Sequence, residues 1–497
     1  MNRRRWGLPG AGGTFAALGC GAALAAGQAP LGLWGLALAG LVGLTAVVAS
    51  AAHVRAAAWT GLLAGAAHFT LALSWLVSPF LIDAAHDGWM APFAVLLMAV
   101  GLALFWAAAA AASTLAASRR RRALAFALAL SGAELARGYV LTGFPWATVG
   151  HIWIDTPLAQ LAALLGAGGL TLLATLAAAL PVAFGRRGLA GGAALLAAAA
   201  SFGLYQLAQP APAARPIMLR LVQPDAAQHL KWDPDAARLI FARLLAYTAA
   251  RPAPDLVIWP ETSVPWLLEA GDGVAPAIAA AGAGAPVAVG IQRVDGARYF
   301  NSLAVIGAAG AVAALYDKHH LVPFGEYVPF GDAMANLFGV SAFAARLGNG
   351  YSAGPGAAVL DLGPRLGRVL PLICYEAVFP QDLRAAPSRP DWILQITNDA
   401  WFGTMTGPYQ HLAQARLRAI EQGLPLVRVA NTGVSAVIDA RGRVVAQIAL
   451  GQAAYLDAAL PAALAAPLYA RWGEWPLLLL LAGLGLPLVL RRRTPKA

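Results

Sequence analysis

Long apolar stretches constrain the fold of this chain more than any single motif does. Eight of them are long enough, or nearly long enough, to cross a bilayer as helices, at about 11–27, 31–50, 56–78, 91–117, 123–141, 158–184, 188–207 and 475–490. Across the 497 residues 59% are hydrophobic and only 12% are charged, which is far too apolar for a soluble enzyme. The sequence therefore predicts a polytopic α-helical membrane domain of about eight spans.

Arginine clusters lie at alternate ends of these stretches, which is typical of cytoplasmic loops. The clusters are Arg3–Arg5, Arg55, Arg119–Arg122, Arg186–Arg187 and Arg491–Arg493. With both termini in the cytoplasm, the long segment between the seventh and eighth spans lies outside it. We expect a transmembrane domain at 1–207, an extracytoplasmic domain at 208–473, and a last span with a basic cytoplasmic tail at 474–497.

The net charge of +11 does not indicate a nucleic-acid-binding protein. Residues 208–473 hold 20 basic and 19 acidic residues, so nearly all of the excess lies at the ends of the apolar stretches. A folded domain that binds nucleic acid would carry that excess on its own surface. We therefore expect a membrane partner and no nucleic acid.

The first apolar stretch has an alternative interpretation as a cleavable signal peptide. Arg3–Arg5 precede an apolar run that ends in small residues at Ala25–Gly27. Cleavage there would leave seven spans and would move no other loop, so the charge pattern leaves both interpretations open.

Short apolar strands alternate with helical stretches within 217–459, which indicates an α/β layered domain with one continuous sheet system. Helices fit 233–250 and 408–423, and DARGR at 439–443 predicts a hairpin turn. No dinucleotide or phosphate-loop motif occurs, and no Cys/His metal cluster, so we expect neither cofactor nor metal. His319 and His320 would point apart in a strand. The strand candidates are IMLRLVQ, DLVIW, APVAVGIQ, SLAVIG, RVLPLICYE, WILQITND, LPLVRVAN and SAVIDA.

Three segments of this domain place a reactive side chain directly after an apolar strand. Cys374 follows the run 369–373, Glu261 follows LVIWP, and Lys318 follows AVAALYD. A thiol attacks only as thiolate and so needs a base, and a lysine ammonium suits an oxyanion better than a wider guanidinium does. We expect a catalytic centre at these residues; the alternative is a buried structural cysteine. The other cysteine, Cys20, lies in the first span, so we expect no disulfide.

Longer motifs around these residues resemble a known family. WPE at 259–261, K-x-x-L-V-P-F-G-E at 318–326 and C-Y-E-x-x-F-P at 374–380 resemble the Glu-Lys-Cys signature of the nitrilase superfamily. Joined to the predicted spans, the match is to the apolipoprotein N-acyltransferase family of bacterial inner membranes. The resemblance extends to four further motifs, ELARG at 134–138, TGFPW at 142–146, TNDAWFG at 397–403 and NTG at 431–433.

The resemblance implies a fold and a role for each matching residue. The fold would be a nitrilase-like α-β-β-α sandwich. Glu261 would be the general base, Lys318 the oxyanion-stabilising cation and Cys374 the acyl-accepting nucleophile. It implies supporting positions at Glu326, Tyr375 and Glu376, and substrate-binding positions at Trp232, Trp401 and Trp146. The spacing of Glu134 and Arg137, three residues apart on one helix, predicts an ion pair. The resemblance implies that this pair contacts a lipid headgroup or braces a loop, and the alternative is a pair that only stabilises the fold.

The family likeness also implies the substrates and the location. The acyl donor would be a membrane phospholipid and the acceptor a diacylglyceryl-modified apolipoprotein, with a thioester on the cysteine between the two half-reactions. The protein would be a monomer of the inner membrane with its catalytic domain in the periplasm. Two other classes of protein stay open: a membrane-tethered nitrilase-type amidohydrolase, which needs no more than one anchor, and a transporter with an accessory domain, which expects ionisable residues in mid-membrane.

The arginine pattern makes the topology testable with fused reporters. A reporter after Arg187 or Arg493 should be active only as a cytoplasmic fusion, and one after Pro212 only as an extracytoplasmic fusion, because basic loops stay in the cytoplasm. Paired phosphatase and fluorescent-protein fusions measure both states. A cytoplasmic signal at Pro212 would overturn the predicted topology.

Overall fold

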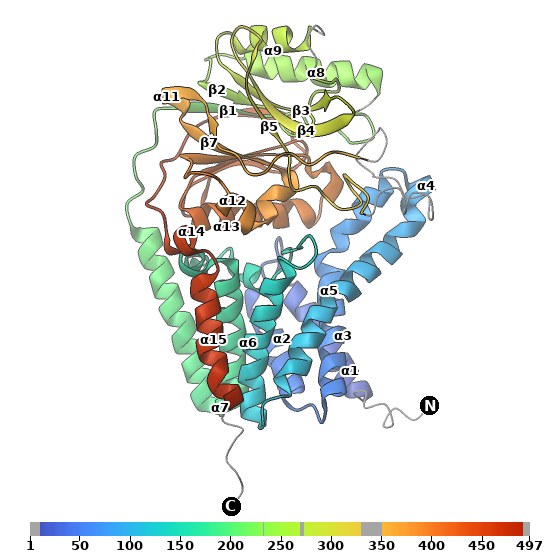
Figure 1. Cartoon of the computed structure of the whole chain (residues 1–497), viewed down its shortest axis with the longest axis vertical. Coiled ribbons are helices and arrows are strands. Elements are labelled where there is room, and N and C mark those ends of the chain that lie inside the picture. The colour runs from blue at the N-terminus through green and yellow to red at the C-terminus, as the bar shows by residue number, and fades with distance from the viewer. Residues whose placement is uncertain (1–9, 232, 269–272, 330–349, 491–497) are drawn as a thin grey trace, which may run out of the picture. The chain divides into compact units, whose positions relative to one another are not determined.

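The computed structural model describes residues 10–231, 233–268, 273–329 and 350–490. The chain divides into two compact units (Figure 1). The first comprises residues 1–210, 405–422 and 466–497, and the second comprises 211–404 and 423–465. The predicted domain boundaries at 207/208 and 473/474 stay predictions.

The first unit is built from helices. Its α-helices are α1 (Ala11–Ala25), α2 (Trp34–Ala49), α3 (Val54–Ala72), α4 (Ala84–Asp87), α5 (Ala91–Ser113), α6 (Arg119–Arg137), α7 (Ala162–Ala208), α13 (Gly407–Gln422), α14 (Leu468–Trp472) and α15 (Trp475–Leu490). Short 3-10 helices η2 (Ser74–Leu81), η3 (Gly88–Met90), η4 (Val149–Trp153) and η5 (Pro157–Leu161) connect them.

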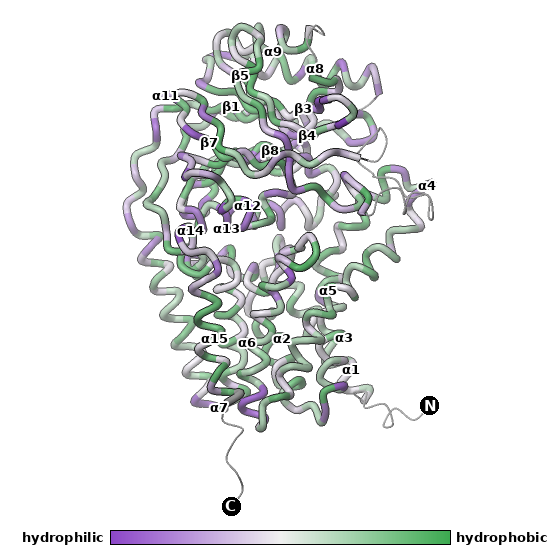
Figure 2. The backbone as a smooth tube through the Cα atoms, in the orientation of Figure 1, coloured by the Kyte–Doolittle hydropathy of each residue, from purple (hydrophilic) through white to green (hydrophobic). Residues whose placement is uncertain are grey.

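Several of these helices are apolar along most of their length (Figure 2). Among the described residues, two helical stretches are long and apolar enough to cross a membrane, Ala84–Ser113 and Pro157–Ala208. A third is added if Val54–Ala72 and Ser74–Leu81, which bend by 48°, form one span. Helices α1, α2 and α15 are apolar but shorter. The apolar helices agree with a membrane protein, and the number of eight spans stays a prediction.

Helix α7 contains a break at the predicted cytoplasmic turn between two spans. Gly185 has φ 59° and ψ −134°, a left-handed conformation that glycine adopts without a steric penalty. The chain then returns so closely that a Cβ on Gly188 would lie 1.9 Å from the carbonyl oxygen of Leu180. The predicted stretches 158–184 and 188–207 therefore meet at a tight glycine turn.

The expected ion pair on α6 forms in the interior of the first unit. Arg137 Nη2 lies 2.9 Å from Glu134 Oε2, and both side chains are almost fully buried. Trp106 Nε1 donates to Glu134 Oε1 at 2.8 Å, and Arg137 donates to the carbonyl of Trp146 at 2.9 Å. A further bond, from the main-chain N–H of Val149 to Glu134, joins the same carboxylate to the 144–149 loop. The pair therefore braces that loop against α6.

The second unit contains two six-stranded sheets, so the prediction of one continuous sheet system is wrong. The first sheet has the order β12-β1-β2-β3-β4-β5 and the second β11-β10-β9-β8-β7-β6. The bounds are β1 (Met218–Gln223), β2 (Leu256–Ile258), β3 (Val287–Asp295), β4 (Arg298–Ile306), β5 (Val312–Asp317), β6 (Leu360–Asp361), β7 (Arg368–Ile373), β8 (Trp392–Thr397), β9 (Leu426–Ala430), β10 (Ser435–Ile438), β11 (Val444–Ile448) and β12 (Ala454–Ala459). Strand spacing cannot reveal which strands share a sheet, because that pairing is long-range.

The predicted strands and the hairpin at 439–443 are confirmed in this unit, where β10 pairs with β11 antiparallel. Helices α8 (Pro234–Ala249) and α9 (Val274–Gly282) pack on the first sheet through an apolar core that includes Leu244, Val257, Trp259 and Ile278. Strands β2 and β3 run parallel and β5 shares their direction, whereas β7, β8 and β9 are mutually parallel. The carboxyl ends of these strands therefore gather at defined edges, where side chains beyond them can meet.

Candidate active site

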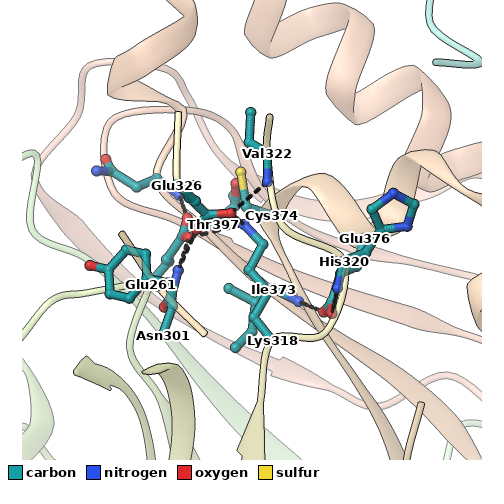
Figure 3. Close-up of polar contacts among 12 residues, drawn as sticks. Glu261, Asn301, Lys318, His320, Val322, Glu326, Ile373, Cys374, Glu376 and Thr397 are labelled. Atoms are coloured by element: carbon teal, nitrogen blue, oxygen red, sulfur yellow. Dashed lines mark hydrogen bonds and ion pairs between the residues drawn. The ribbon is translucent and has the colours of Figure 1, made fainter. Parts of the chain in front are cut away.

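The three predicted catalytic side chains follow the strands from which they were expected. Glu261 lies three residues past the end of β2, Lys318 directly follows β5, and Cys374 directly follows β7. The first two come from one sheet and the cysteine comes from the other. Figure 3 shows these side chains converging on one buried point.

Two carboxylates and an ammonium form the centre of this site. Lys318 Nζ lies 2.7 Å from Glu326 Oε2 and 3.8 Å from Glu261 Oε1. The side-chain amide of Asn301, on β4, donates to Glu261 at 2.7 Å and to Glu326 at 3.1 Å. The main-chain N–H of Asn398 adds a bond to Glu261 Oε2 at 2.7 Å. Each carboxylate is thus fixed by several donors, as buried charges must be.

Burial and mutual charge set the protonation of the cluster. Burial and the neighbouring Glu326 carboxylate raise the pKa of Glu261, and Lys318 opposes that rise. Burial disfavours the charged form of Lys318, but the carboxylates of Glu326 and Glu261 raise its pKa above the usual value. Lys318 is therefore a permanent ammonium, and Glu261 is a carboxylate that accepts a proton more readily than an exposed one.

Cys374 occupies a tight turn next to this cluster. It begins the 3-10 helix η6 (Cys374–Val378) with φ 50°, an uncommon conformation for a residue other than glycine. Burial and the negative charge of Glu261 raise the pKa of the thiol well above its usual value, whereas Lys318 lowers it. The resting side chain is therefore a neutral thiol, which needs a base at the moment of attack.

Glu376 ties the cysteine turn to the lysine segment. Its Oε2 accepts the main-chain N–H of Ile373 at 2.7 Å, and its Oε1 accepts that of His319 at 2.8 Å. Oε1 also accepts the Tyr316 hydroxyl at 2.8 Å. One fully buried carboxylate therefore fixes the residue before Cys374 and the residue after Lys318.

The two neighbouring histidines do not point apart as expected. They follow β5 instead of lying within it, and both approach the same carboxylate. His320 Nδ1 lies 2.8 Å and His319 Nε2 4.0 Å from Asp382 Oδ2. His319 Nδ1 also lies 2.8 Å from Glu376. Within the described part of the chain, no group of three or more His, Cys, Asp or Glu side chains is arranged to hold a metal ion.

The remaining predicted positions differ in their surroundings. Tyr375 is buried and packs edge-to-face against Phe379, with ring centroids 4.7 Å apart. Trp401 is partly exposed in the 3-10 helix η7 (Asp399–Phe402). Trp146 belongs to the first unit and is fully buried, where its indole N–H donates to Gln410 at 2.7 Å. Trp232 lies outside the described residues.

Sequence reasoning missed two residues that reach the cluster. Asn301 interrupts a strand-forming run with a buried amide, and Lys231 donates from its Nζ to the main-chain carbonyl of Glu261 at 3.3 Å. The sequence does contain a signal for Asn301, because a polar residue in the middle of a buried strand needs a hydrogen-bonding partner. Lys231 carried no such local signal.

Comparison with known proteins identifies the class and then the family. A family model described as Carbon-nitrogen hydrolase matches residues 203–469, so the second unit and its cysteine centre define a carbon–nitrogen hydrolase fold. A model described as Apolipoprotein N-acyltransferase N-terminal domain matches residues 20–180. Apolipoprotein N-acyltransferase of Caulobacter vibrioides is 41% identical over 82% of this chain and 81% of its own length. That of Bradyrhizobium diazoefficiens is 39% identical over 89% of this chain and 87% of its own. The chain belongs to the apolipoprotein N-acyltransferase family, whose members are acyltransferases.

About half of this chain is also similar to solved structures. XC1258 from Xanthomonas campestris, a CN-hydrolase superfamily protein, is 23% identical and covers 56% of this chain and 98% of its own, with a TM-score of 0.36. An amidase from Nesterenkonia sp. is 18% identical and covers 54% of this chain and 97% of its own, with a TM-score of 0.37.

The Glu376–His319 pair predicts a pH-dependent contribution to stability. Burial opposes both charges, but their mutual hydrogen bond and attraction raise the pKa of His319 and lower that of Glu376. The contribution of the His319 charge to the free energy of unfolding is complete below its unfolded-state pKa of about 6.5, and it is lost as the pH rises through the raised pKa of the folded state. The contribution of the Glu376 charge is complete above its unfolded-state pKa of about 4.5, and it is lost as the pH falls through the lowered pKa of the folded state. The pair therefore contributes most between about pH 4.5 and 6.5.

Glu376→Gln should destabilise the protein by about 1–3 kcal/mol, because an amide nitrogen cannot accept the N–H of Ile373. Thermal unfolding from pH 4 to 9 should show the largest difference from the parent within the window above. Asp295→Asn removes an exposed ion pair with Arg298 and serves as the control, with little change at any pH. A constant difference across the range would contradict the ion-pair account.

Proposed function

We propose that this protein transfers a fatty acyl chain from a membrane phospholipid to the N-terminal α-amine of a diacylglyceryl-modified apolipoprotein. The observation that carries the proposal is a neutral thiol, Cys374, buried beside a carboxylate and an ammonium, in a chain of the N-acyltransferase family. A thiol that a base deprotonates can attack an ester carbonyl and form a thioester, and a thioester reacts readily with amines.

In the first half-reaction Glu261 takes the proton of Cys374 and the sulfur attacks the ester carbonyl of the phospholipid. Lys318 and the main-chain N–H of Tyr375 stabilise the oxyanion. The carbon–oxygen bond then breaks, Glu261 gives its proton to the departing alcohol oxygen, and a lysophospholipid leaves. The acyl chain remains on sulfur as a thioester.

In the second half-reaction the α-amine of the acceptor attacks the thioester. A carbon–nitrogen bond forms and the carbon–sulfur bond breaks. Glu261 takes a proton from the amine and returns it to the thiolate, so the enzyme regains its starting state. Glu326 and Asn301 hold Lys318 and Glu261 in position throughout, since both contact these groups directly.

The proposal includes the location and the assembly of the protein. The apolar helices of the first unit anchor it in the bacterial inner membrane with several spans, and the catalytic domain faces the periplasm. It acts as a monomer without a cofactor. Trp232 and Trp401 contact the lipid substrates, and Trp146 is a third candidate contact.

Intact-mass analysis of the purified protein with phospholipid and no acceptor tests the first half-reaction. One acyl adduct, removable by neutral hydroxylamine, is expected on the parent and is absent from Cys374→Ala. Cys374→Ser should be almost inactive, and any acyl group on its hydroxyl should persist when a diacylglyceryl-cysteine peptide is added.

Cys20→Ala is the matched control for that experiment, because Cys20 lies in α1 of the first unit. It should form the adduct and pass it to the peptide as the parent does. An adduct on Cys374→Ala, or none on Cys20→Ala, would remove Cys374 from the role of nucleophile. Release of free fatty acid without amide product would indicate that water, and not the acceptor amine, resolves the thioester, as in a hydrolase.

Lys318→Arg tests whether the ammonium acts at the oxyanion or only through its charge. A guanidinium is wider and forked and cannot occupy the space between Glu261 and Glu326, so kcat should fall by about 10²–10³. Steady-state transfer to the peptide measures the loss, and Arg298→Lys, at an exposed ion pair, is the control. Turnover close to that of the parent would be evidence against an oxyanion role.

A further inference from the structure

A second lysine, Lys231, contacts the main chain of the candidate base Glu261 and has no role in the proposed mechanism. It is 4% exposed and follows β1 in the chain, thirty residues before Glu261. Its Nζ donates to the main-chain carbonyl of Glu261 at 3.3 Å. Burial lowers the pKa of Lys231, and the nearby Glu261 carboxylate opposes that lowering.

The segment before Lys231 is fixed by hydrogen bonds to two asparagines that directly follow β9 and β8 of the second sheet. The side chain of Asn431 exchanges two bonds with the main chain of Ala226, at 2.8 and 2.9 Å. Asn398 donates from its side chain to Gln228 at 2.8 Å, and its main-chain N–H binds the Glu261 carboxylate. The same asparagine therefore aligns this segment with the candidate base.

The main chain at Glu261 also needs an external constraint. Thr262 has φ 45°, a conformation that residues other than glycine seldom adopt. Gly290, on β3, approaches so closely that a Cβ there would lie 2.3 Å from the carbonyl oxygen of Pro260. The Lys231 ammonium binds the next carbonyl along the chain, and so helps to fix the turn that presents the carboxylate.

Lys231 also changes the balance of buried charge. Glu261 and Glu326 carry two negative charges, and Lys318 supplies one positive charge against them. A net negative charge in a dry interior favours protonation of a carboxylate. With Lys231 the four groups are neutral in sum. Burial lowers the pKa of Lys231 to about 8, so it carries its proton at neutral pH.

We propose that Lys231 is a positioning residue for the reaction: it fixes the main chain at Glu261 and supplies the positive charge that keeps the Glu261 carboxylate ionised. This inference rests on the proposed function only in taking Glu261 as the base. Among the described residues near Glu261, the other titratable groups do not replace this charge. Cys374 and Tyr351 are neutral, with pKa values raised by burial, and Glu326 adds negative charge.

The test is the pH dependence of Cys374 alkylation by iodoacetamide, followed by intact mass on the full-length protein in detergent. A Cys20→Ala background leaves Cys374 as the only cysteine. Lys231→Gln keeps a donor for the Glu261 carbonyl but removes the charge. Its acid limb should move to higher pH by about one unit, which is roughly a tenfold slower reaction on that limb. Lys231→Arg keeps the charge and should keep the acid limb of the parent.

Arg298→Gln is the matched control, because it removes a positive charge at an exposed ion pair and should leave the profile unchanged. A Lys231→Gln profile that coincides with the parent, or that is slower by one factor at every pH, overturns the proposal. If Lys231→Gln does not fold, Lys231→Met, which also removes the charge, decides: an acid limb at higher pH supports the proposal, and an unshifted limb overturns it.

The same variants, incubated with phosphatidylethanolamine vesicles, separate this inference from the proposed function. Alkylation requires no lipid. A shifted alkylation profile in a protein whose parent forms no acyl adduct would support the role of Lys231 and reject the proposed acyl transfer. A parent that forms the adduct, together with an unshifted Lys231→Gln profile, would support the proposed acyl transfer and reject the role of Lys231.

Discussion

Burial of charge is the physical constraint on which the site depends. Ionised groups in a dry interior cost several kcal/mol each unless they are paired and hydrogen-bonded. Glu261 and Glu326 meet this requirement through Lys318, and Asn301 donates to both carboxylates. These partners come from β4, from the end of β5 and from the loops beyond β2 and β5. The position of the Glu261 carboxylate is therefore fixed by the same contacts that stabilise its buried charge.

Positive-φ residues mark the turns that hold this arrangement. Thr262 follows Glu261, Phe324 lies between Lys318 and Glu326, and Cys374 is itself in a left-handed conformation. Such conformations cost of order 1–3 kcal/mol and persist only where the surroundings fix them. Glu376 supplies part of that constraint, because it binds the main chain on both sides of the site. The thiol is thus held in a strained turn, and the buried carboxylate of Glu376 fixes the main chain beside Cys374 and beside Lys318.

The first unit also contains buried charges that are paired, but this ion pair has a structural role. Glu134 and Arg137 are buried on α6, and their remaining hydrogen-bonding capacity is used by Trp106 and by main-chain groups of the 144–149 loop. The pair shapes a loop and presents no reactive atom. Paired charges in the apolar helical unit therefore have a structural role, whereas the cluster around Glu261 lies beside the Cys374 thiol.

The sequence by itself determined the apolar helices, most strands and the three side chains that follow β2, β5 and β7, because apolar runs and the polar residues that end them are local patterns. Only the tertiary structure decided that the strands form two sheets, that His319 and His320 approach one carboxylate, and that Asn301 and Lys231 reach Glu261. These outcomes depend on contacts between residues thirty or more positions apart. A strand records which of its faces is buried, but it does not record which partner it meets there.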